Sequence, residues 1–349
     1  MLPSEGNTMK AVGYMKAQPI EQADSLLDIE LPIPEANGKD LLVKVNAVSV
    51  NPVDTKIRAA VNPDEGQYKV IGWDAVGEVV ETGEDVEFFN KGDCVWYAGD
   101  LTRSGCNAEY QLVDERIVGH APKSISNAEA AALPLTAITA WELLFDRLLL
   151  QRSNSSVKKE KLCLLIVGAA GGVGSILTQL ATQLTDAIVI GTASRPETQQ
   201  WVKQCGADYV IDHGKALSAE LENIGIENVT HVTSLTHTEE HYDELVKCIA
   251  PQGKLALIDD PAKLLDIKKL KMKSISLHWE FMFTRSMFKT HDMLKQHDLL
   301  NKMAQLIDVG TLSTTLKSTQ GRINAENLKR AHSNIESHNT IGKIVLEGF

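Results

Sequence analysis

A glycine-rich run, Gly168-Ala169-Ala170-Gly171-Gly172-Val173-Gly174, has the residue types that phosphate binding requires. Glycine at 171 lets backbone N–H groups approach phosphate oxygens, and glycine at 174 lets a strand and a helix pack closely. The pattern reads Ala169-x-Gly171-x-x-Gly174, with alanine in the place of the usual first glycine. Such a hexapeptide is weak evidence alone, so its meaning depends on the elements that flank it.

Suitable elements flank the glycine run on both sides. Residues 162–167 form a short apolar run typical of a buried strand, and residues 175–184 have the spacing of an amphipathic helix. A strand, a glycine turn and a helix in this order place a dinucleotide pyrophosphate at the helix N-terminus. The sequence therefore predicts a dinucleotide site. The alternative is a tight strand–helix turn that binds no ligand.

The residues about 20 positions beyond the glycines distinguish NAD from NADP. NAD-binding folds carry an acidic residue there for the ribose hydroxyls, but the segment 191–195 contains no Asp or Glu. Ser194 and Arg195 instead offer a hydroxyl and a guanidinium, which suit a 2′-phosphate. We therefore expect NADP(H), unless Arg195 is only a solvated surface residue.

The remaining sequence predicts two kinds of architecture. Residues 10–118 contain short strand-like runs between turns, with strands expected at 41–50, 75–82, 93–97 and 108–113. Residues 126–149 read as two helices interrupted at Pro134, the first beginning with a capping box of Ser126 and Glu129.

Strand and helix signals alternate from residue 162 onward, which predicts a parallel sheet with helices on both faces. Strands are expected at 162–167, 187–192, 209–211, 229–235 and 254–258, and helices at 175–184, 196–205 and 239–249. A polar surface loop is expected at 151–161. Near the C-terminus, helices are expected at 289–308 and 325–337 and a strand at 343–346.

Composition excludes several classes of partner. The chain has 349 residues, 43% hydrophobic and 23% charged, and its formal charge of −11 disfavours nucleic acids and anionic membranes. Its five cysteines are scattered, as expected of reduced thiols in a cytoplasmic protein. The polar start at residues 1–8 shows no targeting signal, and glycines interrupt the longest apolar stretch. We expect a cytoplasmic protein that acts on a small molecule.

Segments spread over nearly the whole chain resemble the medium-chain dehydrogenase/reductase superfamily. The resemblance is to its quinone oxidoreductase branch, and most closely to the zinc-type alcohol dehydrogenase-like proteins. The matching segments are the glycine run and residues 51–58, 72–79, 92–97, 130–136, 278–283 and 342–345.

The resemblance implies an α/β protein with a GroES-like β-rich catalytic domain at 1–130. A Rossmann domain with a doubly wound parallel sheet would follow at 131–274, and residues 275–349 would return to the first domain. It also implies a homodimer. Further cofactor contacts are implied for Thr139, Ile258, Phe281 and Lys343. The apolar cluster at 279–283 would line either the substrate cleft or a dimer interface, and both remain open.

The family name includes zinc, but the expected ligands are missing. Zinc-dependent relatives have a cysteine near the segment 51–54 and a histidine in a Gly-His-Glu motif, whereas this chain has no such cysteine and reads Gly72-Trp73-Asp74. Indole does not ligate zinc, and the four closely spaced cysteines of a structural site are absent. We therefore expect no zinc. The segment 237–241 matches a metalloprotease H-x-x-E-H pattern, but Thr236 and Glu239 predict a capping box there instead.

Without zinc, no Lewis acid would convert an alcohol to an alkoxide at neutral pH. Reduction of an electrophilic acceptor, a quinone or an α,β-unsaturated carbonyl, is therefore the expected reaction. Candidate proton donors are Asn51, Lys56 and Tyr97, with Asp54 as an orienting partner. Alternatively, Asn51 and Asp54 form a turn and a helix cap, and Trp73 is either a pocket wall or core. Two other functions remain open: a zinc alcohol dehydrogenase with unrecognised ligands, and a non-catalytic NADPH-binding protein.

Overall fold

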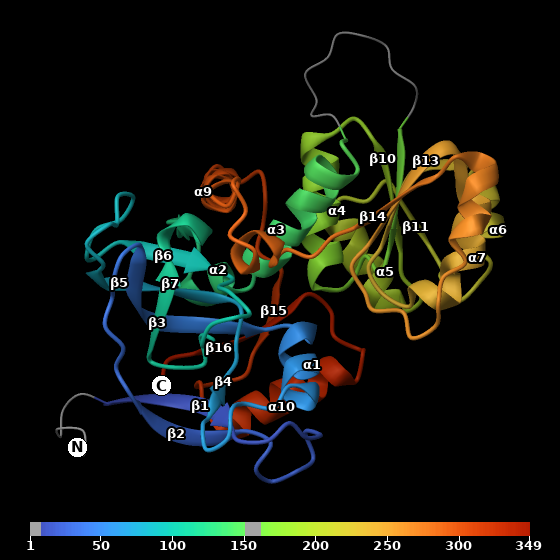
Figure 1. Cartoon of the computed structure of the whole chain (residues 1–349). Helices are drawn as coiled ribbons and strands as arrows, with labels where there is room; N and C mark the ends of the chain where they lie inside the picture. The colour runs from blue at the N-terminus through green and yellow to red at the C-terminus, as the bar shows by residue number, and fades with distance from the viewer. Residues whose placement is uncertain (1–7, 151–161) are drawn as a thin grey trace. The chain divides into compact units, whose positions relative to one another are not determined.

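The computed structural model describes residues 8–150 and 162–349, and its contacts divide the chain into two units (Figure 1). The first unit contains the residues up to Ile138 and the segment Phe283–Phe349, and the second contains Thr139–Met282. Both divisions lie later in the chain than the boundaries expected at 130 and 274. The loop expected at 151–161 and most of the polar start lie outside the described residues.

The first unit is built on two β-sheets. The larger has the strand order β15-β16-β3-β5-β6-β8, and β7 also pairs with β3. Its strands are β3 (Asp40–Val50), β5 (Ala75–Thr82), β6 (Cys94–Tyr97), β7 (Tyr110–Asp114), β8 (Val118–His120), β15 (Leu316–Thr319) and β16 (Lys343–Glu347). The smaller sheet has the order β2-β1-β4, with β1 (Thr8–Tyr14), β2 (Leu27–Pro32) and β4 (Lys69–Val70). The β-rich first domain is confirmed.

The pairing of β16 with β3 returns the end of the chain to the middle of the larger sheet. The two strands are antiparallel, with Ile344 opposite Val50 and Leu346 opposite Val48. The Ser49 hydroxyl donates a hydrogen bond to the Ile344 carbonyl at 2.9 Å. This register places Lys343 beside the end of β3, where the chain enters its first helix.

Short helices connect the strands of the first unit. They are α1 (Pro52–Ala60), the 3-10 helix η1 (Glu115–Ile117), α2 (Asn127–Ala131), α8 (Thr284–Met287), α9 (Lys295–Asp308) and α10 (Ala325–Glu336), and α3 (Pro134–Trp141) crosses the division between the units. The capping box is confirmed, because Glu129 N–H donates to Ser126 Oγ at 3.3 Å and Ser126 N–H donates to Glu129 Oε2 at 2.9 Å. The expected start of α9 at 289 is wrong: Lys289 has a φ of 45°, a left-handed conformation that a helix does not continue through.

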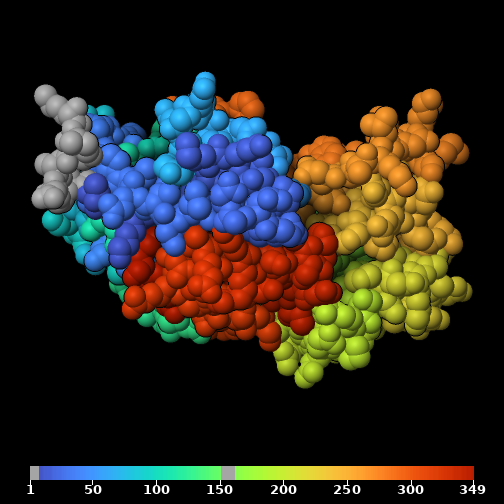
Figure 2. Space-filling view, turned by 90° about the horizontal axis from the view of Figure 1, so that it is seen from below, coloured from blue at the N-terminus to red at the C-terminus, as the bar shows by residue number. Residues whose placement is uncertain are grey.

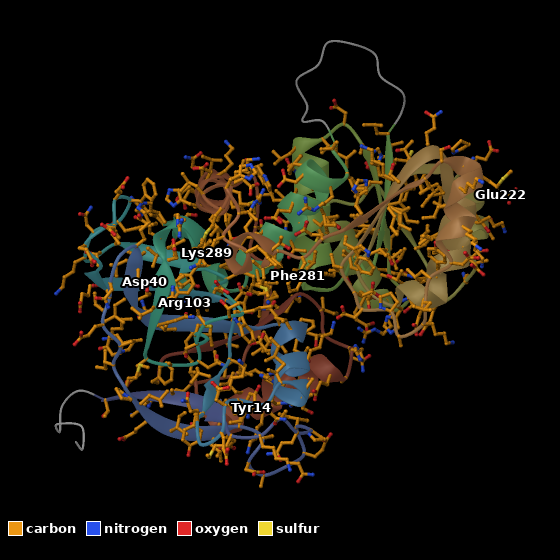
Figure 3. The ribbon with its side chains drawn as sticks, viewed as in Figure 1. Tyr14, Asp40, Arg103, Glu222, Phe281 and Lys289 are labelled. Atoms are coloured by element: carbon orange, nitrogen blue, oxygen red, sulfur yellow. The ribbon has the colours of Figure 1, made fainter. Side chains whose placement is uncertain are left out.

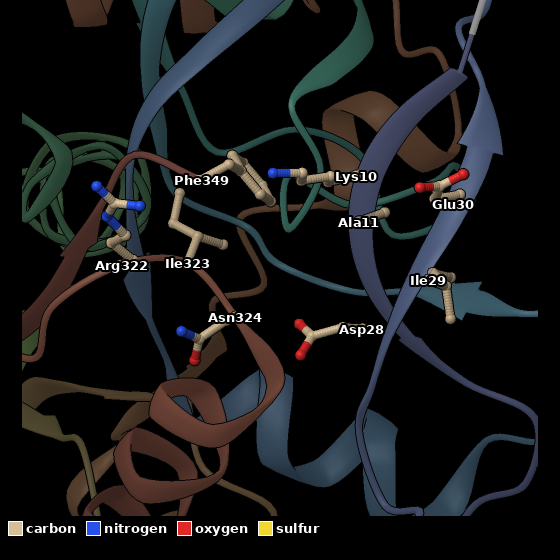
Figure 4. Close-up of a pocket in the computed structure, with 9 residues that line it drawn as sticks. All are labelled: Lys10, Ala11, Asp28, Ile29, Glu30, Arg322, Ile323, Asn324 and Phe349. Carbon is tan, nitrogen blue, oxygen red and sulfur yellow. The ribbon is translucent and has the colours of Figure 1, made fainter. Parts of the chain in front are cut away.

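The red C-terminal segment of the chain, which contains α10, lies beside the blue N-terminal segment in Figure 2. Asp28 of β2 accepts a hydrogen bond from Ala325 N–H at 2.8 Å. The groove beside this contact is lined by charged side chains of both signs, among them Lys10, Glu30 and Arg322 (Figure 4). These side chains are exposed, so the groove presents no desolvated charge that would select a ligand.

The second unit contains a six-stranded parallel sheet with the order β11-β10-β9-β12-β13-β14. Its strands are β9 (Cys163–Val167), β10 (Ile188–Thr192), β11 (Tyr209–Ile211), β12 (Val229–Ser234), β13 (Ile249–Leu257) and β14 (Ser276–Trp279). Every residue of β9 is buried, as expected of a strand covered on both faces. All five strands predicted between residues 162 and 258 are confirmed. Strand β14 was not predicted and lies at the edge of the sheet.

Helices cover both faces of this sheet, with α4 on one side and α6 and α7 on the other (Figure 1). The helices are α4 (Gly172–Leu184), α5 (Pro196–Gln204), α6 (Leu217–Asn223), α7 (Thr238–Cys248), the π-helix η2 (Glu142–Arg147) and the 3-10 helix η3 (Ile267–Lys273). The doubly wound parallel sheet is therefore confirmed. Helix α4 begins at Gly172, before the expected start at 175, because two of the turn glycines already belong to its first turn. Within the described residues, no helix combines the length and hydropathy needed to span a membrane.

Candidate functional site

Four polar side chains meet in the interior of the first unit, and we call them the buried cluster: Asn51, Asp54, Asp74 and Lys343. None of the four is more than 3% exposed. Asn51 and Asp54 lie at the start of α1, Asp74 directly precedes β5, and Lys343 begins β16. The register between β16 and β3 therefore brings together residues from three distant parts of the sequence.

Asp74 is the centre of the buried cluster. Its Oδ2 accepts hydrogen bonds from Lys343 Nζ at 3.0 Å and from Asn51 Nδ2 at 2.8 Å. Its Oδ1 accepts one from Leu135 N–H at 2.7 Å. Lys343 Nζ also donates to Asn51 Oδ1. The amide nitrogen and oxygen of Asn51 and both carboxylate oxygens of Asp74 therefore all take part in hydrogen bonds within the first unit.

Asp54 closes the turn that begins α1. Its Oδ2 accepts a hydrogen bond from Asn51 N–H at 2.8 Å, so the helix-capping alternative is confirmed. The pKa of Asp54 is raised from its ordinary 3.8 to about 7, mainly by burial and also by the neighbouring Asp74 carboxylate. The Asn51 N–H and the Lys343 ammonium oppose this rise. Burial also raises the pKa of Asp74, against the attraction of Lys343.

The raised pKa of Asp54 predicts a pH dependence of stability. Because its pKa is higher in the folded chain, the folded state holds more protons between about pH 4 and 7, and stability falls as pH rises through that window. We expect the loss of unfolding free energy between pH 5 and pH 8 to be about 2 kcal/mol smaller in Asp54→Asn than in the natural chain. Urea denaturation at both pH values measures it. Asp64→Asn, at an exposed carboxylate, is the control, and equal losses in Asp54→Asn and the natural chain would contradict the prediction.

The remaining catalytic candidates lie apart from one another. Lys56 is exposed on α1, whereas Tyr97 is completely buried at the end of β6. Burial raises the pKa of the Tyr97 phenol well above its ordinary 10, and no described residue bonds to its hydroxyl. Trp73 is also completely buried. Its indole donates to the Asp100 carbonyl at 3.3 Å and meets Phe283 edge to face with 6.4 Å between ring centroids, so Trp73 belongs to the core.

The glycine run forms the turn between β9 and α4 in the second unit. Gly168 has a φ of 83°, which favours glycine, and Gly171 is the N-cap residue of α4. A Cβ at 171 would meet only the Gly168 carbonyl oxygen at 3.6 Å, an ordinary contact that leaves this side of the turn open. A Cβ at 174 would fall 2.4 Å from the same oxygen and 2.6 Å from Ala169 Cα. Gly171 therefore leaves room for a ligand, and Gly174 permits close strand–helix packing.

The alanine at 169 packs against a glycine, Gly191, on the neighbouring strand β10. Ala169 is completely buried, and a Cβ at Gly191 of β10 would lie 2.9 Å from the Ala169 Cβ. The missing side chain at 191 thus makes space for the extra methyl group at 169. The departure from the usual fingerprint is accommodated by this pair of residues and leaves the turn intact.

Ser194 and Arg195 follow the carboxyl end of β10. Ser194 is exposed, and Arg195 is the N-cap residue of α5 and pairs with Glu197 at 3.2 Å between exposed side chains. The sequence reasoning missed their neighbours. The Thr192 hydroxyl accepts a hydrogen bond from Gly168 N–H at 3.1 Å and lies 3.1 Å from His213 Nδ1. Thr192 therefore links the glycine turn to the strand that precedes Arg195.

The four residues assigned to the cofactor through the family resemblance lie in different environments. Thr139 is buried in α3, and Ile258 is half-buried directly after β13. Phe281 is 48% exposed, and Figure 3 shows it in the segment that follows β14. Lys343 belongs to the buried cluster of the first unit. Asp74, its ion-pair partner, was not among the predicted site residues, although the triplet Gly72-Trp73-Asp74 marked its position.

The histidine pair at 237 and 241 shows no metal-binding geometry. His237 is the N-cap of α7 with a φ of 50°, and within the described residues no group of three or more His, Cys, Asp or Glu could hold a metal ion. The capping box predicted for Thr236 and Glu239 is wrong. Helix α7 begins at Thr238, and the Thr238 N–H donates to the Asp259 carboxylate, two residues beyond the end of β13.

Comparisons with known proteins agree with this architecture. Residues 37–123 match the alcohol dehydrogenase GroES-like domain, and residues 205–346 match the zinc-binding dehydrogenase domain. A zinc-type alcohol dehydrogenase-like protein of Staphylococcus epidermidis is 37% identical over 97% of this chain and 99% of its own length.

Solved structures extend the comparison. A Rhizobium etli CFN 42 protein described as a zinc-dependent alcohol dehydrogenase is 55% identical over 98% of both chains, with a TM-score of 0.94. The Escherichia coli quinone oxidoreductase, solved with NADPH, shares the fold at 23% identity, covers 97% of this chain and 99% of its own, and has a TM-score of 0.78. The chain belongs to the zinc-type alcohol dehydrogenase-like proteins of the medium-chain dehydrogenase/reductase superfamily, a family of oxidoreductases.

Proposed function

We propose that the chain reduces quinones or α,β-unsaturated carbonyl compounds with NADPH, by hydride transfer and without zinc. The observation that carries this proposal is that three side chains of the buried cluster hydrogen-bond to one another. Asn51, Asp74 and Lys343 satisfy one another, so neither a metal ligand set nor a spare proton donor is left among them.

The residues at this position do not fit a catalytic zinc. Zinc in such sites takes three protein ligands from cysteine, histidine and carboxylate groups. Here Trp73 donates its only polar hydrogen to a backbone carbonyl, and Asp74 is paired with the Lys343 ammonium. A cation would have to displace that ammonium from a carboxylate whose two oxygens already accept three hydrogen bonds.

The second unit fits NADPH. Gly171 leaves the N-terminus of α4 open, where free N–H groups attract a pyrophosphate. Ser194 and Arg195 lie at the carboxyl end of β10, the edge of the sheet at which dinucleotides bind, and supply donors for a 2′-phosphate. The E. coli quinone oxidoreductase of the same fold was solved with NADPH, which supports this choice of cofactor.

The class of acceptor follows from the lack of a Lewis acid and of a free hydrogen-bond donor in the buried cluster. The bound nicotinamide provides a hydride at C4. The buried cluster holds neither a Lewis acid nor an uncommitted donor that could polarise a simple ketone, so we expect an acceptor that is itself electrophilic. Addition of hydride to an enone gives an enolate that takes a proton from water, and addition to a quinone gives a hydroquinone anion that does the same. The residues of this chain then act by binding and orienting the acceptor.

An acceptor screen tests this proposal. Protein purified without added zinc is mixed with NADPH and a series of quinones, short enals and simple ketones, and the loss of NADPH absorbance is followed. We expect consumption with the first two classes, little with the ketones, and a metal content well below one zinc per chain. About one tightly held zinc per chain would favour the zinc alcohol dehydrogenase alternative. Tight NADPH binding without consumption would favour a non-catalytic role.

Replacing Arg195 with alanine tests the 2′-phosphate contact. We expect the affinity for NADPH to fall by about tenfold to thirtyfold and that for NADH to change less than about twofold, because only NADPH carries the extra phosphate. The exposed ion pair with Glu197 costs little to break. Fluorescence titration of both cofactors measures the effect, and Lys203→Ala at the other end of α5 is the control. Equal losses for the two cofactors would contradict the assignment.

We also propose a homodimer in a reducing compartment. Among the described strands, β14 pairs only with β13, and Trp279 at its end is 53% exposed, so its free edge can pair with a second copy. The five cysteines are free thiols, four of them buried, which suits cytoplasm. Light scattering after size exclusion measures the oligomeric state.

A further inference from the structure

Three side chains connect the carboxyl ends of two neighbouring strands in the second unit. Ser234 ends β12, Thr238 begins α7, and Asp259 follows β13. The Thr238 N–H donates to Asp259 Oδ2 at 2.9 Å, and the Thr238 hydroxyl donates to Asp259 Oδ1 at 2.6 Å. The Thr238 and Ser234 hydroxyl oxygens lie 2.7 Å apart. Ser234 and Thr238 are completely buried, and Asp259 is half-buried.

A second contact holds the same segment after β13. Glu239 Oε2, in the first turn of α7, accepts a hydrogen bond from Lys263 N–H at 2.7 Å. The start of α7 therefore binds the segment at two points, Asp259 and Lys263. The Asp259 carboxylate also lies at the positive end of the α7 dipole. His237, directly before α7, has a φ of 50°, a left-handed conformation that persists in a residue other than glycine when its surroundings impose it.

We propose that Asp259 is a positioning residue for the nicotinamide half of the cofactor. This inference rests on the proposed binding of NADPH. Asp259 directly follows Ile258, at the carboxyl edge of the parallel sheet where a dinucleotide lies. With both of its oxygens bonded to Thr238, Asp259 fixes the backbone that presents Ile258. We call these two hydrogen bonds between Thr238 and Asp259 the clamp. Without it, the start of α7 holds the segment through Glu239 and Lys263.

The adenosine half of the cofactor depends on other residues. Ser194 and Arg195 follow β10, which lies on one side of β9, whereas β12 and β13 lie on the other side. Loss of the Asp259 clamp should therefore weaken the nicotinamide contacts and leave the adenosine contacts unchanged. A general loss of folding would weaken both halves.

Calorimetric titration with two ligands tests the proposal. Asp259→Asn removes the carboxylate charge and one acceptor oxygen, and Thr238→Val removes the hydroxyl donor, so each variant weakens the clamp from one side. Thr238→Ser retains the hydroxyl, and Glu222→Gln on the exposed face of α6 is the control (Figure 3). The ligands are NADPH and adenosine 2′,5′-bisphosphate, which carries only the adenosine end. We expect Asp259→Asn and Thr238→Val to bind NADPH about tenfold more weakly and the bisphosphate within about twofold of the natural chain. Thr238→Ser and Glu222→Gln should bind both ligands normally.

Equal weakening of both ligands, or unchanged NADPH binding in the two clamp variants, would overturn the positioning role. A natural chain that binds neither ligand would overturn the proposed function itself and this inference with it. A natural chain that binds both ligands, with variants that lose both, would overturn only the positioning role. Two variants at different residues keep the test decisive if one of them fails to fold.

Discussion

Replacing Gly171 with alanine is expected to lower the affinity for NADPH at least about tenfold while changing the unfolding free energy by less than about 1 kcal/mol. Gly171 has a φ of −74°, which alanine adopts without strain, and the new Cβ would make only an ordinary contact. The methyl group would instead occupy the open side of the turn and hold a pyrophosphate away from the N–H groups of α4. Calorimetric titration with NADPH and urea denaturation measure the two effects.

Gly174→Ala is the matched control, because it adds the same methyl group three residues further along, where the backbone leaves no room for it. Its Cβ would lie 2.4 Å from a backbone oxygen and 2.6 Å from a backbone carbon, neither of which can turn away. We expect a loss of about 3 kcal/mol or more in unfolding free energy, at the upper end of overpacking effects. If Gly171→Ala destabilised the chain as much as Gly174→Ala does, both glycines would be structural and the phosphate role of Gly171 would be lost.

Lys343→Met is the second change with a large expected effect. It leaves the Asp74 carboxylate in the interior without its cation, and removing one partner of a buried ion pair costs about 3–5 kcal/mol. The pKa of Asp74 should then rise further, because the ammonium that opposes the effect of burial is gone. Urea denaturation at pH 7 measures the loss.

Two variants separate charge from packing. Lys343→Arg keeps a cation and should lose less stability than Lys343→Met. Combining Lys343→Met with Asp74→Asn removes both charges and should recover part of the loss. If the double variant were less stable than Lys343→Met alone, the ion pair would not be the cause of the destabilisation.

The first five strands of the second unit and the helices α4, α5 and α7 could be predicted because their signals are local. A buried strand such as β9 is a continuous apolar run, and Pro196 sets the start of α5 within its own segment. The start of α7 could not be predicted in this way. A capping box is recognised from two residues of one segment. The acceptor at the start of α7 is Asp259, which is 21 positions beyond Thr238.

The buried cluster marks a similar limit of sequence reasoning. Asn51 and Asp54 were identified because they share a short motif, and the structure brings them together. The pairing of Asp74 with Lys343 spans 269 positions and depends on the register between β3 and β16. No spacing rule reveals that register. The family resemblance implied a cofactor contact for Lys343, and its ion pair with Asp74 emerged only from the folded chain.

The late position of β16 in the sequence has a consequence for biosynthesis. The second unit is one continuous segment, so it can fold as soon as the ribosome has released it. The first unit cannot be completed then, because β16 and its lysine follow the second unit in the chain and leave the ribosome after it. A chain that stops short of residue 343 would expose the free edge of β3 and keep Asp74 without a counter-ion. Incomplete translation products would then be open to proteolysis, and the ion pair would form only in chains translated past residue 343.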